Sequence, residues 1–397
     1  MYILLLLLSL IFGVATNPNY FYLREFSARD NHYVYDMVES GANLYLASND
    51  DWMYLKNITI RTGAHTYTLE KLLVPNDDGS AASIPIPGNF SIVTTNNNTV
   101  TAKLSGFFYF TTALQAQDPT FHVFVVQTTR SVSVTGMKST VVILNTLLKA
   151  SLLDGDLPHR TSYVTNIKQS PNTNLYFHWD MPYDDWKSET NNTFFQNPIV
   201  LKKGTESVRM FFDHVEPLQI ALEYWYFTVD GPVSMDMENK FENDDHYNAT
   251  ATSTTGVMIS YYYFYDHFVN FQLDWSSGGV SGYFTSAFID DRDSYLEIKL
   301  DYYDYSSSDK LYQGCNNVGV LSYEYQQAYT LSASVLQIGD GPFYIQYFNF
   351  AGDLWHTSTI GNNVTSTTPV PTTHKNGSSA VFAMEFVVLV LMVLLLS

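Results

Sequence analysis

Apolar and polar residues alternate with a period of two along much of this chain. The segment 269–275, VNFQLDW, places its apolar residues on one face of an extended strand and its polar residues on the other. The segment 295–302, YLEIKLDY, repeats the pattern. Because an α-helix turns once every 3.6 residues, such alternation does not produce an apolar helix face. The pattern therefore predicts β-strands with one buried and one exposed face.

Seven further segments have the composition of strands, and clusters of Gly, Asn, Asp and Pro separate them as turns do. These segments are WMYLKNITI, TVTAKLSGFFYF, FHVFVVQTT, SVRMFFDHV, LQIALEYWYFTV, YTLSASVLQI and FYIQYF. Only 139–155, STVVILNTLLKASLLDG, also fits a helix, and it fits a pair of strands equally well. Many short strands of this kind predict an all-β fold of two or three antiparallel β-sandwich modules.

The N-terminal end has the pattern of a signal peptide. An apolar run from Ile3 to Phe12 is followed by Gly13-Val14-Ala15, which places small residues where a signal peptidase cleaves. A buried core helix is the alternative, although it would begin at residue 3 and stop before Asn17-Pro18. We therefore expect residues 1–15 to be removed and the chain to enter the secretory route.

The C-terminal end has the pattern of a signal for glycosylphosphatidylinositol (GPI) attachment. Its uninterrupted apolar run, 386–396, is eleven residues, which as a helix is about 16 Å long against a bilayer core of about 30 Å. No Lys or Arg follows it. Small residues at Asn376, Gly377 and Ser378 precede a spacer and the apolar run. We predict attachment at Asn376, with Gly377 and Ser378 as alternative sites, and removal of 377–397; a short transmembrane helix is the alternative.

The charge balance restricts the partners of the protein. Twenty Lys and Arg stand against 39 Asp and Glu, a net charge of −19. Nucleic acid needs basic side chains to neutralise its phosphates, and an anionic lipid surface attracts basic segments. Both are disfavoured as partners. The aromatic content of 16%, with 30 Tyr, suits a β-rich extracellular domain, because these rings pack well on pleated surfaces.

Sequons for N-glycosylation mark candidate surface positions in a secreted chain. The predicted glycosylation sites are Asn57, Asn89, Asn97, Asn191, Asn248 and Asn363. Asn376 also begins a sequon, but it is the predicted attachment site of the lipid anchor.

Cys315 is the single cysteine, so the chain cannot form an intrachain disulfide. Its stability must therefore come from apolar burial and sheet hydrogen bonds. Three interpretations of Cys315 remain open: a buried inert thiol, a bridge in a disulfide-linked dimer, and a reactive nucleophile.

Composition also divides the chain. We predict a first β module over 17–129, which closes with DPTFHVFVVQTT, and a second β region over 130–354, formed by one large or two small modules. Residues 357–376 are rich in Ser, Thr and Pro and have no apolar face, so they cannot offset the entropy of ordering. They are predicted to form a disordered, O-glycosylated stalk.

The segments DPTFHVFVV, DGPFYIQYF and LLKASLLDGDLPHRTSYVTNI resemble the CUB-like secreted and surface proteins of nematodes. The resemblance implies CUB-like jelly-roll modules, a lipid-anchored end and a surface role in innate defence or stress responses. CUB modules usually carry paired disulfides and often a calcium site. This chain lacks the cysteines, so no calcium ligand is carried over by the resemblance.

No motif of established chemistry occurs in the sequence: there is no phosphate-binding Gly loop, His-Glu-x-x-His or Gly-x-Ser-x-Gly. Asp-His pairs occur at 213–214, 245–246 and 266–267, but neighbours on a strand point to opposite faces. We therefore interpret them as independent side chains. The acidic segments DDRD, DYYD and ENDDH offer oxygen ligands for Ca²⁺, although acidic loops are usually only solvated. We predict no catalytic residues, no metal site and no cofactor, with Ca²⁺ as the alternative.

Two aromatic segments are candidate contact sites. MPYDDWKS, 181–188, contributes Tyr183 and Trp186, and YYYFYDHF, 261–268, contributes Tyr261 and Tyr263. The second segment has aromatic residues on both faces of any strand, so one face should meet another module, a partner or a glycan. The alternative is a strand buried on both sides between sheets.

Together these patterns predict a GPI-anchored glycoprotein on the extracellular face of the plasma membrane. Its expected activity is recognition of a cell-surface or microbial protein or glycan, without catalysis. The alternatives are a surface hydrolase that acts on glycans through paired carboxylates and a structural coat glycoprotein.

Overall fold

The computed structural model confirms an all-β chain. It describes residues 19–28, 32–35, 38–56, 58–63, 65–88, 90–94, 102–148, 160–182, 192–203, 206–242, 246–260, 267–271, 279–285, 295–302, 306–312, 320–322, 328–335, 343–351 and 364–366. Among these residues the helices are short: η1 (Leu23–Ala28), α2 (Trp52–Leu55), α3 (Glu70–Leu73) and α5 (Ala113–Gln117). No helix in this part of the chain has the length and apolar composition that crossing a membrane requires.

The first sandwich consists of two antiparallel sheets, each named here after one inner strand. The β8 sheet has the order β1-β8-β3-β6 and the β7 sheet the order β2-β7-β4-β5. Their strands are β1 (Asn19–Tyr22), β2 (His32–Tyr35), β3 (Ala42–Ala47), β4 (Ile58–Thr62), β5 (His65–Thr68), β6 (Ile84–Ile86), β7 (Phe90–Thr94) and β8 (Phe107–Phe110). The core between the sheets contains Leu44, Ile60, Phe90, Ile92 and Phe108.

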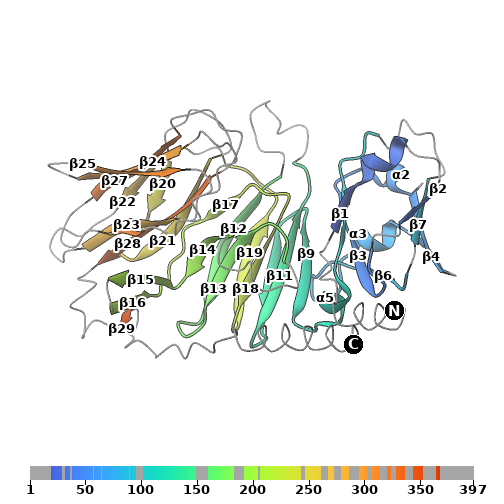
Figure 1. Ribbon diagram of the computed structural model, residues 1–397, viewed down its shortest axis with the longest axis horizontal. Helices are drawn as coiled ribbons and strands as arrows, with labels where there is room; N and C mark the ends of the chain where they lie inside the picture. Colours follow the sequence, from blue (N-terminus) through green and yellow to red (C-terminus); the bar gives the residue numbers. More distant parts are fainter. Residues whose placement is uncertain are drawn as a thin grey trace, which may run out of the picture.

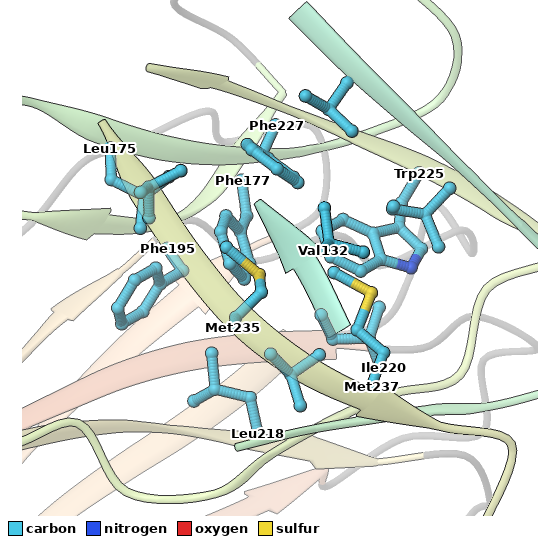
Figure 2. Close-up of a cluster of buried hydrophobic side chains, with 14 of the residues drawn as sticks. Val132, Leu175, Phe177, Phe195, Leu218, Ile220, Trp225, Phe227, Met235 and Met237 are labelled. Atoms are coloured by element: carbon cyan, nitrogen blue, oxygen red, sulfur yellow. The ribbon is translucent and has the colours of Figure 1, made fainter. Parts of the chain in front are cut away.

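The second sandwich lies beside the first along the long axis of the molecule (Figure 1). The β18 sheet has the order β14-β13-β18-β11-β9 and the β19 sheet the order β10-β19-β12-β17. Their strands are β9 (Phe121–Val126), β10 (Arg130–Val134), β11 (Ser139–Asn145), β12 (Ser162–Gln169), β13 (Leu175–Trp179), β14 (Thr193–Asn197), β17 (Leu218–Ile220), β18 (Tyr224–Val229) and β19 (Val233–Glu238). Figure 2 shows its core, in which Trp225 and Phe177 pack near Met235.

Two segments of this sandwich can be compared with the sequence predictions. β9 lies within the segment predicted to close the first module, but it pairs in parallel with β11 of the β18 sheet; the boundary at residue 129 stays a prediction. Residues 139–145, which fitted a helix or a strand, form β11. The strand is favoured because β11 is buried along both of its faces, which an amphipathic helix would not achieve.

The third pair of sheets follows in the chain. The β28 sheet has the order β21-β28-β23-β26 and the β27 sheet the order β20-β22-β27-β24-β25. Their strands are β20 (His246–Ala249), β21 (Thr254–Ser260), β22 (His267–Phe271), β23 (Gly279–Thr285), β24 (Tyr295–Tyr302), β25 (Ser306–Tyr312), β26 (Val320–Ser322), β27 (Ala328–Val335) and β28 (Phe343–Ala351). β20 and β22 are parallel; this pair and β9 with β11 are departures from the antiparallel arrangement that the sequence predicts.

A small sheet of order β15-β16-β29 completes the described fold, with β15 (Ile199–Lys203), β16 (Glu206–Met210) and β29 (Val364–Ser366). β29 lies within 357–376, which the sequence predicts to be a stalk without regular structure. Its pairing with β16 corrects that expectation for three residues. The physical reason is that β16 offers open backbone groups at its edge, and Val364 and Thr365 are β-branched.

The β18 sheet is buried on both faces, and this arrangement joins the first two sandwiches. Alternate residues of its strands point into the core of the second sandwich, and the residues between them pack against the β8 sheet. The second cluster contains Tyr45, Ala47, Phe107 and Tyr109 of the β8 sheet and Val123, Val125, Val142, Leu144 and Tyr226 of the β18 sheet. Strands buried on both faces are expected to be continuously apolar, as the run VVIL at 141–144 of β11 is.

Polar contacts join the second sandwich to the third. The buried amide of Gln346 on β28 accepts from the backbone N–H of Gln196 at 2.9 Å and donates to the carbonyl of the same residue at 2.7 Å. Gln196 lies on β14, an edge strand of the β18 sheet. The side chain of Gln346 therefore satisfies backbone groups that would otherwise be open at this edge.

We predict that replacing Gly256 by Ala destabilises the third sandwich. Gly256 lies opposite Tyr347 in the β21–β28 ladder, and a Cβ at this position would be 2.3 Å from the Tyr347 hydroxyl oxygen. Because Tyr347 is buried, the ring has little room to move. The loss in the free energy of unfolding should be about 1–3 kcal/mol, as overpacked cores show.

Urea unfolding would measure this loss, with Gly88→Ala as the matched control. A Cβ at Gly88 meets nothing within 4 Å, so this change should alter stability by less than about 0.5 kcal/mol. Equal unfolding curves for Gly256→Ala and the wild-type protein would contradict the packing described for Tyr347.

Candidate functional site

A cluster of aromatic and charged side chains lies where the first two sandwiches meet. On β1, Phe21 points into the core of the first sandwich, while Tyr20 and Tyr22 point toward the β18 sheet, as the strand period of two requires. The Tyr20 ring lies 5.0 Å from the ring of Tyr224, measured between centroids. Tyr20 remains 38% exposed. We call Tyr20, Tyr22, Arg24, Arg160, Glu223 and Tyr224 the junction cluster.

Arg160 is the buried charge at the centre of the junction cluster. Only 7% of its side chain is exposed, and its Nε lies 2.8 Å from Oε1 of Glu223. One guanidinium nitrogen donates to the carbonyl of Asn145 at 2.8 Å, and another donates to the carbonyl of Ser105 at 2.6 Å. The guanidinium also lies 5.0 Å from the centroid of the Phe107 ring. Burial lowers the pKa of Arg160, and the carboxylate of Glu223 opposes that shift.

These contacts connect the sandwiches because the partners of Arg160 come from both. Ser105 and Phe107 belong to the first sandwich, whereas Asn145 and Glu223 belong to the second. The Ser105 carbonyl is held in place by the carboxylate of Asp50, which accepts from the backbone N–H groups of Ser105 and Gly106, both at 2.8 Å. A buried charge is tolerated only when such hydrogen bonds satisfy it.

Tyr22 completes the polar part of the cluster by donating a hydrogen bond to Oε2 of Glu223. Burial and this hydrogen bond raise the pKa of Tyr22 well above its ordinary value of 10. Burial and a hydrogen bond with Tyr20 raise the pKa of Tyr224 in the same direction. Both phenols therefore remain protonated near neutral pH, and Tyr22 remains a donor.

The outer rim of the cluster is open to solvent. Arg24 is exposed, and its guanidinium lies 4.3 Å from the centroid of the Tyr22 ring. Glu223 is 30% exposed. Tyr and Arg are the residues that most often dominate binding energy at protein interfaces, because they combine apolar area with directed polar groups. The arrangement is therefore suited to contact with a ligand through its tyrosines and Arg24. The carboxylate of Glu223 is already ion-paired with Arg160 and hydrogen-bonded to Tyr22.

A buried histidine lies on the same face of the β18 sheet. His178 of β13 stacks on Tyr226, with ring centroids 4.5 Å apart and an interplanar angle of 16°. Its Nδ1 lies 3.0 Å from the hydroxyl oxygen of Thr193, and its Nε2 lies 3.1 Å from that of Thr228. Burial lowers the pKa of His178 from 6.5 to about 4, although a hydrogen bond with Asn192 opposes the shift. The imidazole is therefore neutral near neutral pH.

Among the residues that the sequence singles out, Asn248 is described with its side chain, and it is exposed on β20. The others lie outside the described residues: Asn57, Asn89, Asn97, Asn191, Asn363, Asn376, Gly377, Ser378, Tyr183, Trp186, Tyr261, Tyr263 and Cys315. Those predictions stay predictions.

The Asp-His pair at 213–214 can be compared with the structure. His214 contacts Glu216, two residues along the chain, with Nε2 to Oε1 at 3.4 Å, rather than its neighbour Asp213. Glu216 is buried and also accepts from the hydroxyls of Thr250 and Thr254, both at 2.9 Å. Within the described ranges, no group of three or more His, Cys, Asp and Glu residues is arranged to hold a metal ion.

The sequence analysis missed the junction cluster, although part of its signal is present. NYFYL at 19–23 has aromatic residues on both faces of a strand, the same signal that drew attention to YYYFYDHF. No local pattern identifies Arg160 or Glu223, because their partners lie 15 to 201 residues away in the chain.

Comparisons with known proteins match one family profile, and the solved structures that they match include two with CUB domains. The profile of a family described as "Glycoprotein: Transmembrane glycoprotein" matches residues 39–392. No curated protein matches the chain. The CUB1-EGF-CUB2 domains of rat MASP-1 match with 11% identity and a TM-score of 0.19, over 58% of this chain and all of that one. The CUB1-EGF-CUB2 domain of human MASP-1/3 matches with 11% identity and a TM-score of 0.18, over 57% and 94%. TM-scores this low carry no argument about the fold.

We predict that the stability of the protein falls as the pH falls from about 6.5 to about 4. In that interval an unfolded chain protonates residue 178, whereas the folded protein keeps His178 neutral. Stability therefore decreases on acidification, by about 2 kcal/mol between pH 7 and pH 5 for this group alone.

Urea unfolding of His178→Gln at both pH values would test this prediction. Glutamine cannot titrate, so the variant should lose about 2 kcal/mol less on acidification than the wild-type protein does. His65→Gln, a change at an exposed position, should keep the wild-type dependence. If His178→Gln and the wild-type protein lost the same stability on acidification, the conclusion that the buried His178 imidazole stays neutral would be wrong.

Proposed function

Because this chain belongs to the family described as transmembrane glycoproteins, we propose that it is a membrane-attached extracellular glycoprotein that recognises a protein or a glycan. The observation that supports a role in recognition is the junction cluster. Its partly exposed tyrosines and its exposed arginine lie where the packed β8 and β18 sheets meet. The finer parts of the proposal are the GPI anchor, the CUB-like character and a role in defence or stress responses.

Preorganisation is the physical advantage of a site at this junction. Binding costs entropy when side chains and loops must be ordered, and a preformed surface avoids much of that cost. In the junction cluster, Tyr22 is fixed by Glu223, and Glu223 by Arg160. The Tyr20 ring packs against Tyr22 and Tyr224. A ligand would therefore meet a surface whose aromatic rings are already positioned.

The attachment to the membrane rests on the C-terminal tail, which lies outside the described residues. Its apolar run of eleven residues supports a GPI anchor, because a helix of that length is about half as long as the bilayer core is thick. The description of the family favours the alternative, a retained transmembrane segment, and the family profile extends to residue 392, within the apolar run. The two forms of attachment can be distinguished by their response to a phospholipase that cleaves GPI anchors.

We predict that phosphatidylinositol-specific phospholipase C releases the protein from intact cells that express the full-length chain. A matched variant in which the run 386–396 is lengthened to about 20 apolar residues should stay on the membrane, because it can span the bilayer. Retention of the wild-type protein, under conditions that release a known GPI-anchored protein, would contradict the anchor and favour the transmembrane segment.

Recognition is tested with the full-length protein displayed on cells. We expect the cells to bind at least one member of two panels, an array of immobilised oligosaccharides and a library of extracellular protein domains. Tyr20→Ala should weaken that binding at least tenfold, because Tyr20 is an exposed ring of the junction cluster. Tyr54→Ala, a change at another exposed tyrosine, is the matched control. Absence of binding in both panels, or equal loss in the two variants, would contradict the proposal.

A further inference from the structure

The solvent-facing part of the junction cluster offers little apolar surface beyond one aromatic ring. Within the described part of the chain, the large hydrophobic side chains that are exposed are Tyr20, Met53, Tyr54, Val74, Leu114, Met137 and Val200. Of these, Tyr20 alone belongs to the junction cluster. The buried centre of a protein–protein interface is usually formed by several apolar and aromatic residues. The cluster therefore fits a smaller ligand better than it fits the surface of a second protein.

The Tyr20 ring is held in place by the rings around it. Its centroid lies 5.7 Å from that of Tyr22, 6.4 Å from that of Phe107 and 5.0 Å from that of Tyr224. The rings of Tyr22 and Phe107 are nearly perpendicular to it, at 89° and 82°. A sugar ring has a face of C–H groups that can stack on the electron-rich face of an aromatic ring. Because Tyr20 is already positioned and is 38% exposed, such stacking costs little ordering.

Polar groups of both kinds accompany the exposed ring. Arg24 is exposed, and a guanidinium group carries five N–H donors. Glu223 is 30% exposed, and its two carboxylate oxygens each accept from one partner, Arg160 or Tyr22. A carboxylate has about four acceptor sites, so Glu223 can accept further hydrogen bonds from solvent or from a ligand. Sugar hydroxyls both donate and accept, so they match this combination.

Asp180 adds a second carboxylate close to Tyr224. It directly follows β13, it is exposed, and its Oδ1 accepts from the backbone N–H of Met181 at 2.9 Å. Burial and the contact with Tyr20 are the main causes of the raised pKa of Tyr224, and the charges of Asp180 and Glu223 act in the same direction. Asp180 also has a φ of 75°, in the left-handed region, which residues other than glycine adopt rarely and often at functional sites.

The charges of this surface disfavour an anionic ligand. Beside the two cations Arg24 and Arg160 lie the carboxylates of Glu25, Asp180 and Glu223. Glu25 is exposed and accepts from the backbone N–H of Tyr22 at 3.3 Å. The whole chain has a net charge of −19. A sugar that carries a carboxylate or a sulfate would be repelled by this charge distribution, whereas an uncharged sugar would not.

We propose that the junction cluster binds an uncharged sugar unit of a glycan, with the sugar ring stacked on Tyr20 and its hydroxyls hydrogen-bonded to Arg24 and Glu223. Asp180 accepts from a further hydroxyl at the side of Tyr224. The inference rests on the proposed function, because it specifies the ligand class of the same site. It selects an uncharged glycan over an anionic glycan and over a protein surface.

An array of immobilised oligosaccharides tests the ligand class. It carries uncharged oligosaccharides together with their sialylated and sulfated counterparts at equal density. The probe is beads coated with the mature protein from eukaryotic cells, because many copies on one bead make weak binding measurable; uncoated beads give the background. We expect binding to at least one uncharged oligosaccharide and at least tenfold weaker binding to its charged counterparts. Raising the salt concentration from about 0.05 to about 0.5 M should change the binding less than twofold, because salt screens charges and not stacking.

Two substitutions of Tyr20 separate the aromatic ring from its apolar character. Tyr20→Phe keeps the ring, so its binding should stay within about threefold of the wild type. Tyr20→Leu keeps an apolar side chain but removes the ring, so it should bind at least tenfold more weakly, as the loss of a central aromatic contact does. Tyr54→Leu, at an exposed tyrosine outside the junction cluster, should bind as the wild type does. Urea unfolding of each variant checks that it is folded.

Binding to the charged oligosaccharides that equals or exceeds binding to the uncharged ones would overturn the inference. Equal binding by Tyr20→Leu and Tyr20→Phe would also overturn it. If the protein binds an extracellular protein domain but no oligosaccharide, and Tyr20→Leu loses that binding, the inference fails and the proposed function stands. Absence of binding to both oligosaccharides and protein domains would instead contradict the proposed function itself.

Discussion

The β18 sheet packs apolar side chains against another sheet on each of its two faces, and the described fold depends on this double burial. One face, with Trp225 and Phe227, closes the core of the second sandwich, and the other, with Tyr226 and Val142, covers the β8 sheet. The chain has a single cysteine, so no intrachain disulfide can hold the sandwiches together. Apolar burial, which scales with the area removed from water, does this in its place.

The polar junctions follow from that apolar contact. When the β8 and β18 sheets pack together, Arg160 is buried among carbonyl groups from both sandwiches. Its charge is paired with Glu223, which in turn accepts a hydrogen bond from Tyr22. A similar logic applies at the next junction, where Gln346 bonds the open backbone of β14. Such networks add little where water competes but are costly to leave incomplete when buried. They therefore fix the relative placement of neighbouring sandwiches more than they add to stability.

The period of two predicted many of the strands, because alternation depends only on local geometry. It was wrong for the start of WMYLKNITI, where Trp52–Leu55 form the helix α2. The segment 295–302 forms β24, and FYIQYF lies within β28.

The alternation did not predict which sheet or core each face of a strand contacts. The segment GFFYF has aromatic residues on both faces of a strand, and β8 is buried along its whole length. Phe108 and Phe110 lie in the core of the first sandwich, whereas Phe107 and Tyr109 pack against the β18 sheet. Two-sided burial of this kind was considered only for YYYFYDHF, which lies outside the described residues. The candidate site was missed for the same reason, since Tyr22 and Glu223 are 201 residues apart.

The sequence by itself determined the β class, the absence of an intrachain disulfide, the acidic charge and the place of Asn248 in a sequon. Each of these depends on residue identity or on neighbours within a few positions. Tertiary structure alone decided that β9 joins the second sandwich and that Arg160 is buried between two sandwiches. The physical reason is that strand pairing and burial are contacts between distant segments, and local alternation is compatible with many ways of making them.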